Sequence, residues 1–460
     1  MLTGCGLLFL YTSMDVTNNC EIQVLGGGPA GLATAYFAVK HGFNCQLFEG
    51  ASEVGGNFRT LRSGDFLFDT GAHRLHDKDL EVTHEIHELL GKHLLHVTAP
   101  SKIYSGGKFF EFPLRLADLF KHLDYETLLS IVVENIGLGR FRKPDNFAQF
   151  ATGRFGRTLA HRFLLNYSAK LWGRKPEFLS IEIAGGRLQK MGLVSFVLDT
   201  CFGWYNHHRP KHLEGSFLYP KHGIGMISDA INESIGAENV KLNSRITEVI
   251  HDGKKIERVV INDDYTLPSS IVVNTLPITQ LVKMFSPAPP PEIVSAAAAI
   301  SFRHVVLCVL SLNQNSFSKN ASIYFPENEY PFTRLYEPKN RSPAMAPEGK
   351  TAIVLEIPCY SEDKVWSLPD NELQPMVWDA LQKVKRVADE DVVNFESFRL
   401  GFAYPVLEVG HLDVVKQLVS YFDRFDNLHM TGRNSLFRYL HFHDLFRAGK
   451  ELIVEISKKI

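Results

Sequence analysis

The apolar positions near the N-terminus of the chain come in two short runs that flank an alanine-rich segment. The first run is Ile22-Gln-Val-Leu25, and the second is Cys45-Gln-Leu-Phe48, which is followed by Glu49. Short apolar runs bounded by turn residues are typical of buried strands. With a helical segment between them, they predict a βαβ unit of a parallel sheet.

Three glycines lie in the turn between the first run and the helix. Gly26 suits a tight turn, Gly28 lets the backbone approach a pyrophosphate, and Gly31 allows the helix to pack closely on the strand. The pyrophosphate would lie at the N-terminus of the helix. Glu49 would accept hydrogen bonds from both ribose hydroxyls of an adenosine, and it disfavours a 2′-phosphate. The stretch therefore predicts a dinucleotide-binding site.

The rest of the chain alternates between helical and strand patterns. The spacing of apolar residues predicts helices over 80–90 and up to Ile235 and Ile456, a Gly-Gly hairpin over 103–113, mainly helical structure from 115 to about 208, and strands over 240–250, 259–262, 271–277, 302–312 and 351–357. We expect the strands over 302–312 and 351–357 to form an antiparallel substrate-domain sheet. A Pro-rich turn and an Ala-rich helix at 284–300 mark a boundary.

Composition and charge narrow the class of protein. A chain of 460 residues suggests two interleaved domains, and a formal net charge of −2 indicates neither a nucleic-acid nor a membrane partner. Six scattered cysteines without C-x-x-C spacing, among them Cys45 and Cys308 in apolar runs, predict buried, reduced thiols. Residues 1–19 read as a loose leader, and no stretch is long enough to span a bilayer. We expect a cytoplasmic protein.

The residues after Glu49 favour FAD over NAD. Gly55-Gly56-Asn57-Phe58-Arg59-Thr60 resembles the extension of the dinucleotide motif in flavoproteins of the amine oxidase, protoporphyrinogen oxidase and phytoene desaturase superfamily. The stretches around Ile246, Asn274-Thr275-Leu276-Pro277 and Gly432-Arg433 resemble later blocks of that superfamily, in the same order. The resemblance implies an FAD site formed by Gly26, Gly28, Pro29, Ala30, Gly31, Glu49, Gly56, Asn57, Arg59, Gly71, Ala72, His73, Ile246, Thr275, Gly432 and Arg433.

A glycine loop with two histidines follows an alternating strand. Gly71-Ala72-His73 and His76 resemble the flavin-facing loop of UDP-galactopyranose mutases, which places His73 beside the isoalloxazine ring. A histidine there can change charge near neutral pH and could stabilise a reduced, anionic flavin. Capping of the turn is the alternative role. We do not expect metal binding, because no third ligand lies at a recognisable spacing.

Three further segments resemble the mutases. Tyr167-Ser-Ala-Lys-Leu-Trp-Gly173 includes Lys170 and Trp172, which either face a substrate or belong to the core. Arg334 falls on a residue that contacts the diphosphate of the sugar nucleotide in mutases, although a solvated or ion-paired arginine is an equal alternative. Tyr439 matches a C-terminal mutase pattern, whereas His441 replaces its aspartate. Arg187 is a weak candidate for a second phosphate ligand. The last helix would direct its N-terminus at the flavin.

The predicted fold class is α/β: a discontinuous Rossmann-type FAD-binding domain with an inserted helical and antiparallel-sheet substrate domain. The predicted ranges are 1–19 for the leader, 20–100, 215–285 and 395–460 for the FAD-binding domain, 101–214 for the helical insertion and 286–394 for the substrate domain.

Two reactions fit this fold. The first is hydride transfer from a small-molecule substrate to flavin N5 in an FAD-dependent oxidoreductase, with His73, Arg334 and Tyr439 as the catalytic candidates. The second is isomerisation of a nucleotide sugar through N5 of reduced flavin, as in the mutases. A purely structural FAD is a third alternative. The sequence leaves the oligomeric state open.

Overall fold

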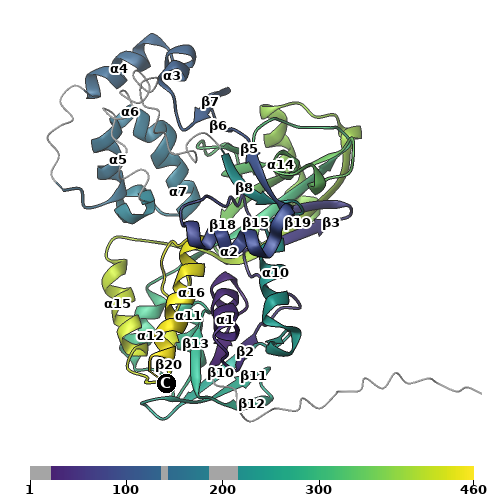
Figure 1. Ribbon diagram of the computed structural model, residues 1–460. Helices are drawn as coiled ribbons and strands as arrows, with labels where there is room; N and C mark the ends of the chain where they lie inside the picture. The colour runs from purple at the N-terminus through teal and green to yellow at the C-terminus, as the bar shows by residue number, and fades with distance from the viewer. Residues whose placement is uncertain (1–21, 136–142, 186–215, 460) are drawn as a thin grey trace, which may run out of the picture.

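The computed structural model describes residues 22–135, 143–185 and 216–459. The predicted leader, Arg187, and Cys5, Cys20 and Cys201 lie outside these ranges. Figure 1 shows a parallel sheet with its helices in the lower half, a second large sheet at the upper right and a group of helices at the upper left.

The lower half is built on a five-stranded parallel sheet. Its strands are buried on both faces, as parallel strands covered by helices are expected to be. Their order is β20 (Leu428–Met430), β13 (Ile271–Asn274), β1 (Ile22–Leu25), β2 (Cys45–Phe48) and β9 (Val240–Lys241). β1 pairs in parallel with both β2 and β13, so the predicted βαβ unit is confirmed.

Helices cover both faces of this sheet. One face packs on α1 (Pro29–Lys40), α2 (Leu80–Leu90), α10 (Gly225–Ile235) and α16 (Phe442–Ser457), and the other on α11 (Ile278–Met284), α12 (Pro291–Ala298) and α15 (His411–Phe422). The second face also carries a four-stranded sheet in the order β12 (Tyr265–Pro268), β11 (Ile256–Ile261), β10 (Ile246–His251) and β14 (Phe285–Ser286). α16 lies close to α1, because a Cβ on Gly449 would come within 2.9 Å of the Cβ of Ala33.

The second large sheet has seven strands. Their order is β19 (Val392–Pro405), β15 (Phe302–Leu312), β18 (Thr351–Cys359), β17 (Arg334–Tyr336), β16 (Ser322–Tyr324), β6 (Ser101–Ser105) and β7 (Lys108–Phe112). All neighbouring pairs are antiparallel except β16 and β6. One face packs against α14 (Asp370–Val384), and the other packs against the hairpin of β3 (Thr60–Ser63) and β4 (Phe66–Asp69).

The seven-stranded sheet draws on segments that the sequence assigned elsewhere. The predicted hairpin forms β6 and β7, which extend this sheet. β19 crosses the boundary predicted between residues 394 and 395, because it pairs along most of its length with β15. The predicted domain ranges remain predictions. β19 continues from this sheet into the C-terminal segment of the chain.

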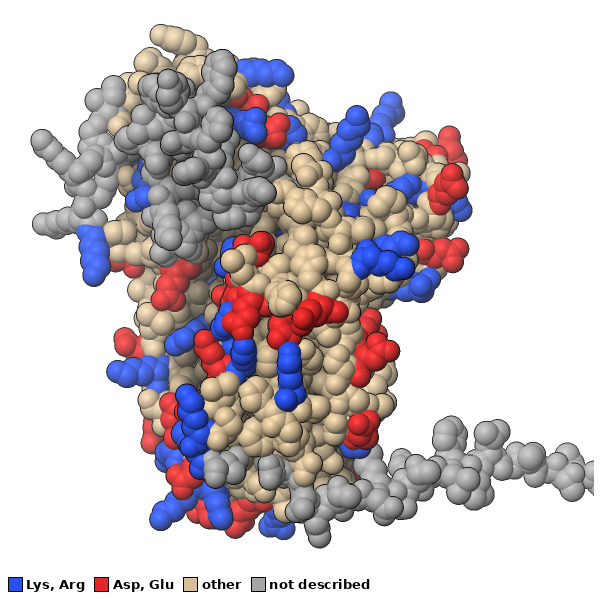
Figure 2. Space-filling model, in the orientation of Figure 1, with Lys and Arg blue, Asp and Glu red and all other residues tan. Residues whose placement is uncertain are grey.

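The helical group consists of α3 (Leu116–His122), α4 (Tyr125–Asn135), α5 (Phe147–Phe155), α6 (Arg157–Leu159), a π-helical turn at Ala160–Leu165, and α7 (Asn166–Trp172). A two-stranded ladder of β5 (Leu94–Thr98) and β8 (Ser216–Pro220) joins segments on either side of this group in the sequence. None of the helices in the described ranges has the length and apolar character needed to cross a membrane. On the face in Figure 2, acidic and basic side chains are interspersed.

The cysteine prediction is confirmed where the structure describes it. Cys45, Cys308 and Cys359 are buried free thiols. Burial raises the pKa of Cys308 to about 12 and that of Cys359 to about 11, so both remain protonated at neutral pH.

Candidate functional site

The glycine turn after β1 combines two tight contacts with one open position. Gly26 has a φ of +102°, and a Cβ on it would lie 2.7 Å from Oγ1 of Thr275. A Cβ on Gly31 would lie 1.9 Å from the carbonyl oxygen of Gly26, so α1 could not keep its place with a larger residue there. A Cβ on Gly28 meets nothing within 4 Å. Gly28 therefore borders open space at the N-terminus of α1, where Pro29 is the first residue.

Glu49 lies next to this turn at the end of β2. One carboxylate oxygen accepts a hydrogen bond of 2.8 Å from the Gly27 amide, and the other accepts one of 2.8 Å from the Ala51 amide. The backbone amide of Ser244 donates to the Glu49 carbonyl. Ile246 follows at the start of β10 and is buried in the same core as Phe48. The acid and the predicted adenine contact are thus brought together.

Segments from three parts of the chain meet at the N-terminus of α1. Gly56 approaches Gly28, since a Cβ on Gly56 would lie 3.2 Å from the Gly28 Cα. Gly432 approaches Ala30 in the same way, at 2.9 Å. Thr275 donates through Oγ1 to the carbonyl of Leu25, at 2.8 Å. The predicted FAD residues from the start, middle and end of the chain therefore lie side by side.

Asn57 and Arg59 hold the Gly-Gly extension in place. The Asn57 side chain donates to the Gly401 carbonyl in β19 at 2.9 Å. Arg59 donates to the Gly56 carbonyl at 2.8 Å and forms an ion pair of 2.7 Å with Glu53. Asn57 thereby ties the nucleotide segment to the seven-stranded sheet.

The loop after β4 is fixed by the seven-stranded sheet. The Ala72 amide donates to the carboxylate of Glu356 in β18, at 3.2 Å, and the Tyr336 hydroxyl donates to the Asp69 carbonyl at 2.5 Å. The His73 ring meets Phe58 edge to face, with 5.1 Å between ring centres. Its Nε2 has no hydrogen-bond partner in the part of the chain that the structure describes. A Cβ on Gly71 would lie 3.3 Å from this atom.

The structure corrects the expected charge behaviour of His73. Burial, followed by the positive charges of Arg334, Arg341 and Arg433, lowers its pKa to about 3. The ring is therefore neutral at pH 7 and does not change charge near neutral pH. A neutral imidazole can still donate or accept a hydrogen bond through the unpartnered Nε2.

Arg334 is bound to a carboxylate that sequence analysis did not identify. Its Nε and Nη2 donate to the two oxygens of Glu356, at 2.9 and 2.7 Å. Glu356 is 3% exposed in the middle of β18, and the pair raises the pKa of Arg334. A carboxylate within a largely apolar strand requires a partner. The position of Glu356 in such a run was the sequence signal that could have identified it. The ion-paired alternative for Arg334 therefore describes the structure, and its role in substrate binding stays a prediction.

Three aromatic rings and one arginine form a cluster beside this ion pair, which we call the aromatic group: Trp172, Tyr404, Tyr439 and Arg433. Trp172 contacts both tyrosines edge to face at 6.0 Å, and the two tyrosines stack at 6.2 Å. The guanidinium of Arg433 lies 5.1 Å from the Tyr404 ring and 4.3 Å from the Tyr439 ring. Trp172 and Tyr404 are largely enclosed, whereas Tyr439 is 42% exposed.

Arg433 has two nitrogens that make no hydrogen bond within the described residues. They are Nε and Nη2, and both are buried. A buried guanidinium without acceptors is unfavourable, and an acceptor from a ligand would satisfy it. Arg433 directly follows Gly432, which touches α1, so these donors lie beside the predicted flavin site.

Lys170 and the N-terminus of the last helix both make hydrogen bonds within the protein. Lys170 donates to the carbonyls of Phe325 and Glu327 at 2.8 and 2.9 Å, and burial lowers its pKa to about 7. The last helix begins at Phe442 and is capped by its own residues, because the Asp444 carboxylate accepts from the His441 amide at 2.9 Å. The N-terminus of α16 is therefore partly satisfied internally, and its action on the flavin stays a prediction.

The residues around the glycine turn fit an FAD molecule. The open side of Gly28 would take the pyrophosphate, and Glu49 would bind the ribose. Arg433 and His73 would bind the polar edge of the flavin ring through nitrogens that have no partner among the described residues.

Most of the chain matches a known protein family. Residues 29–449 match the family described as flavin containing amine oxidoreductase. Mitochondrial protoporphyrinogen oxidase of Nicotiana tabacum is 24% identical over 255 residues, and the match covers 50% of each protein, so the chain spans about half the length of this relative.

Two solved structures share the fold over nearly the whole chain. A reduced UDP-galactopyranose mutase superposes with a TM-score of 0.84 at 19% identity, with 96% of each chain covered. A putative protoporphyrinogen oxidase from Exiguobacterium sp. 255-15 gives 0.76 at 18% identity, covering 95% of this chain and 99% of that one. Because the family match extends over most of the described residues, the chain belongs to the flavin containing amine oxidoreductase family.

Proposed function

We propose that this protein oxidises a small-molecule substrate by transferring a hydride from it to the flavin. The bound FAD would supply N5 as the hydride acceptor. One observation carries the choice between oxidation and isomerisation of a nucleotide sugar: Glu356 engages two nitrogens of Arg334. The arginine that would bind a diphosphate in a mutase is thus already neutralised.

The Arg334–Glu356 pair has a positioning role in this proposal. Arg334 fixes Glu356, Glu356 accepts from the Ala72 amide, and Ala72 precedes His73. This chain of contacts would hold the His73 loop against the flavin. Substitution of Arg334 would therefore change the position of the His73 loop as well as substrate binding.

The aromatic group would form the wall that excludes water from the reacting bond. Trp172 is buried and Tyr404 is half-buried, and Tyr439 contacts both from the more exposed side. An apolar, aromatic wall suits a substrate that is oxidised at a C–N or C–C bond, because it keeps water from the reacting carbon. His73 stays neutral beside it and can exchange a hydrogen bond without adding charge.

Anaerobic reduction of the purified yellow protein tests the proposal. We expect the flavin absorbance to bleach on mixing with at least one member of a panel of amines and protoporphyrinogen, and to return with oxygen or another acceptor. UDP-sugars should leave the spectra of the oxidised and the dithionite-reduced protein unchanged. Isomerisation of a UDP-sugar by the reduced protein, without bleaching by any member of the panel, would replace our proposal with the mutase.

A further inference from the structure

Arg341 is a buried cation with unused hydrogen-bond donors. It follows the short helical turn Pro338–Asn340 after β17 and is 3% exposed. Its Nη2 donates to the Ala321 carbonyl at 3.1 Å and to the Ser322 hydroxyl at 3.3 Å, and the guanidinium lies 4.9 Å from the Tyr336 ring. Nε and Nη1 have no hydrogen-bond partner among residues 22–135, 143–185 and 216–459. Two of its three nitrogens therefore remain available to a ligand.

A second guanidinium meets Arg341 at the same hydroxyl. Arg74 donates to Oγ of Ser101 at 2.6 Å and to Oγ of Ser322 at 3.5 Å. Ser101 and Ser322 are register partners in the parallel pair of β6 and β16, and both are buried. The two cations are thus fixed by neighbouring strands and converge on Ser322.

The nearby carboxylates are engaged by other groups. Glu356 is bound to Arg334. Asp69 accepts from the Tyr219 hydroxyl, the Ile224 amide and the Thr60 hydroxyl, and Glu337 accepts from two backbone amides and the Thr351 hydroxyl. Within the described ranges, Arg341 makes no ion pair of its own. The buried guanidinium of Arg341 favours a bound anion, because a buried charge without an ion-pair partner is costly.

We propose that Arg341, Arg74 and Ser322 bind an oxyanion group, a carboxylate or a phosphate, of a small molecule. Guanidinium groups suit planar and tetrahedral oxyanions, and the Ser322 hydroxyl adds a donor between them. Arg74 adjoins His73 in the chain, so a molecule held here lies beside the predicted flavin-facing loop. The anion site is inferred from these contacts alone. Its assignment to the oxidised substrate rests on the proposed function, and under that assignment the substrate is an anionic molecule.

Binding is measured on the flavin-loaded protein, without turnover. The protein is prepared in a phosphate-free zwitterionic buffer and titrated with inorganic phosphate or with acetate at constant ionic strength, by calorimetry and by thermal unfolding. We expect one of the two anions to raise the melting temperature at saturation, and the choice between them separates a phosphate from a carboxylate site. Chloride serves as the ionic-strength control.

Two variants and a matched control complete the test. Arg341→Met should weaken anion binding at least tenfold and should melt no lower than the wild type without anion, because it removes a buried unpaired charge. Ser322→Ala should weaken binding less. Arg258→Met, which removes an exposed arginine on β11, should bind like the wild type.

Three results would overturn the proposal: absence of phosphate and acetate binding in the wild type, equal binding in Arg341→Met, or equal binding in Ser322→Ala if the methionine variant fails to fold. Anion binding does not require catalysis. A protein that binds the anion but bleaches with no reducing substrate would contradict the proposed function and leave this site standing.

Discussion

At the scale of single residues, the open space beside Gly28 separates folding from cofactor binding. The Gly28 φ of −72° suits any residue, and a Cβ there meets nothing. We therefore expect Gly28→Val to fold but to lose most of its flavin, because the side chain occupies the space meant for the pyrophosphate. The ratio of flavin to protein absorbance and the melting temperature measure both effects.

The contrasting variant is Gly31→Val. Its side chain would collide with the Gly26 carbonyl, so we expect it to fail in folding as well as in flavin binding. Full flavin occupancy in Gly28→Val would remove the glycine turn from the FAD site.

His73 gives a prediction on pH. Its pKa is lowered to about 3 in the folded state, from an ordinary value of 6.5. The unfolded chain therefore binds a proton that the folded protein excludes between these values, and stability is lost as the pH falls below 6.5. The slope is at most about 1.4 kcal/mol per pH unit for one such group. We expect His73→Gln to unfold with a shallower pH dependence between pH 6 and pH 4, measured by denaturant titration.

The same variant tests whether His73 faces the flavin. His73→Gln should keep FAD and shift the flavin midpoint potential, because the hydrogen bond from Nε2 changes. An altered pH dependence with an unchanged potential and unchanged turnover would assign His73 to the turn alone, and His76 would become the nearer candidate.

At the scale of elements, local sequence patterns predicted the strands and turns well. β1, β2, β15, the hairpin of β6 and β7, and α10 lie where the spacing placed them. Their signals are local: apolar runs, alternation and glycine positions. The edge-to-edge order of the seven-stranded sheet has no such signal, because it depends on pairing between segments as distant as β6 and β16. The assignment of β19 was missed for that reason.

The candidate site was predicted in the same uneven way. The predicted FAD residues could be named because each belongs to a motif with fixed spacing, and the structure brings several of them together. Glu356 and Tyr404 belong to no motif, and only the fold brings them to Arg334 and Arg433. The lowered pKa of His73 likewise depends first on burial and then on three arginines from distant segments.

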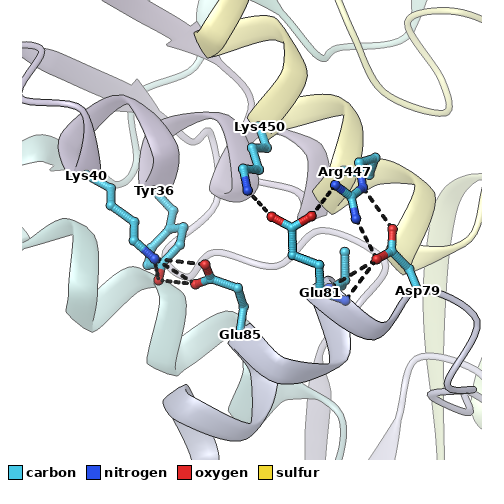
Figure 3. A network of polar contacts seen from close by, with 8 residues as sticks. Tyr36, Lys40, Asp79, Glu81, Glu85, Arg447 and Lys450 are labelled. Atoms are coloured by element: carbon cyan, nitrogen blue, oxygen red, sulfur yellow. Dashed lines mark hydrogen bonds and ion pairs between the residues drawn. The ribbon is translucent and has the colours of Figure 1, made fainter.

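An ion-pair network links α2 to α16 and α1 (Figure 3). Asp79 caps the N-terminus of α2 by accepting from the Glu81 and Val82 amides, and it accepts two hydrogen bonds from Arg447 of α16, at 2.8 and 2.6 Å. In the middle of α2, Glu85 binds Lys40 and Tyr36 of α1. Because Asp79 directly follows the His73 loop, the network holds the end of that loop on the last helix.

We expect Asp79→Ala to lower the free energy of unfolding by about 1–2 kcal/mol, since it removes a helix cap and the two bonds to Arg447. Lys40→Met, which breaks an exposed pair with Glu85 in the middle of the same helix, should cost less than about 1 kcal/mol. Urea unfolding of both variants provides the comparison. Equal losses would show that the cap and the pair with Arg447 add nothing to α2.

At the scale of the whole molecule, the predicted FAD site joins segments that are far apart in the chain. Gly28 comes from the start, Thr275 from the middle and Gly432 from the end, and Asn57 connects this site to the seven-stranded sheet. A ligand that touches all of them stabilises the folded chain in proportion to its binding free energy. The flavin should therefore strengthen the contact between the parallel and the seven-stranded sheet.

Arg433 provides the sharpest test of this coupling, because it extends from the C-terminal turn onto Tyr404 of the seven-stranded sheet. Two of its donors have no partner in the part of the chain that the structure describes. A hydrogen bond from a charged donor is worth about 1.5–3 kcal/mol. Arg433→Ala should therefore weaken FAD binding by about ten- to a hundred-fold and shrink the difference in melting temperature between the flavin-loaded and flavin-free protein. Arg438→Ala, an exposed arginine five residues later, is the matched control and should leave both quantities unchanged. An Arg433→Ala protein with unchanged FAD affinity would show that these donors serve the substrate side of the aromatic group.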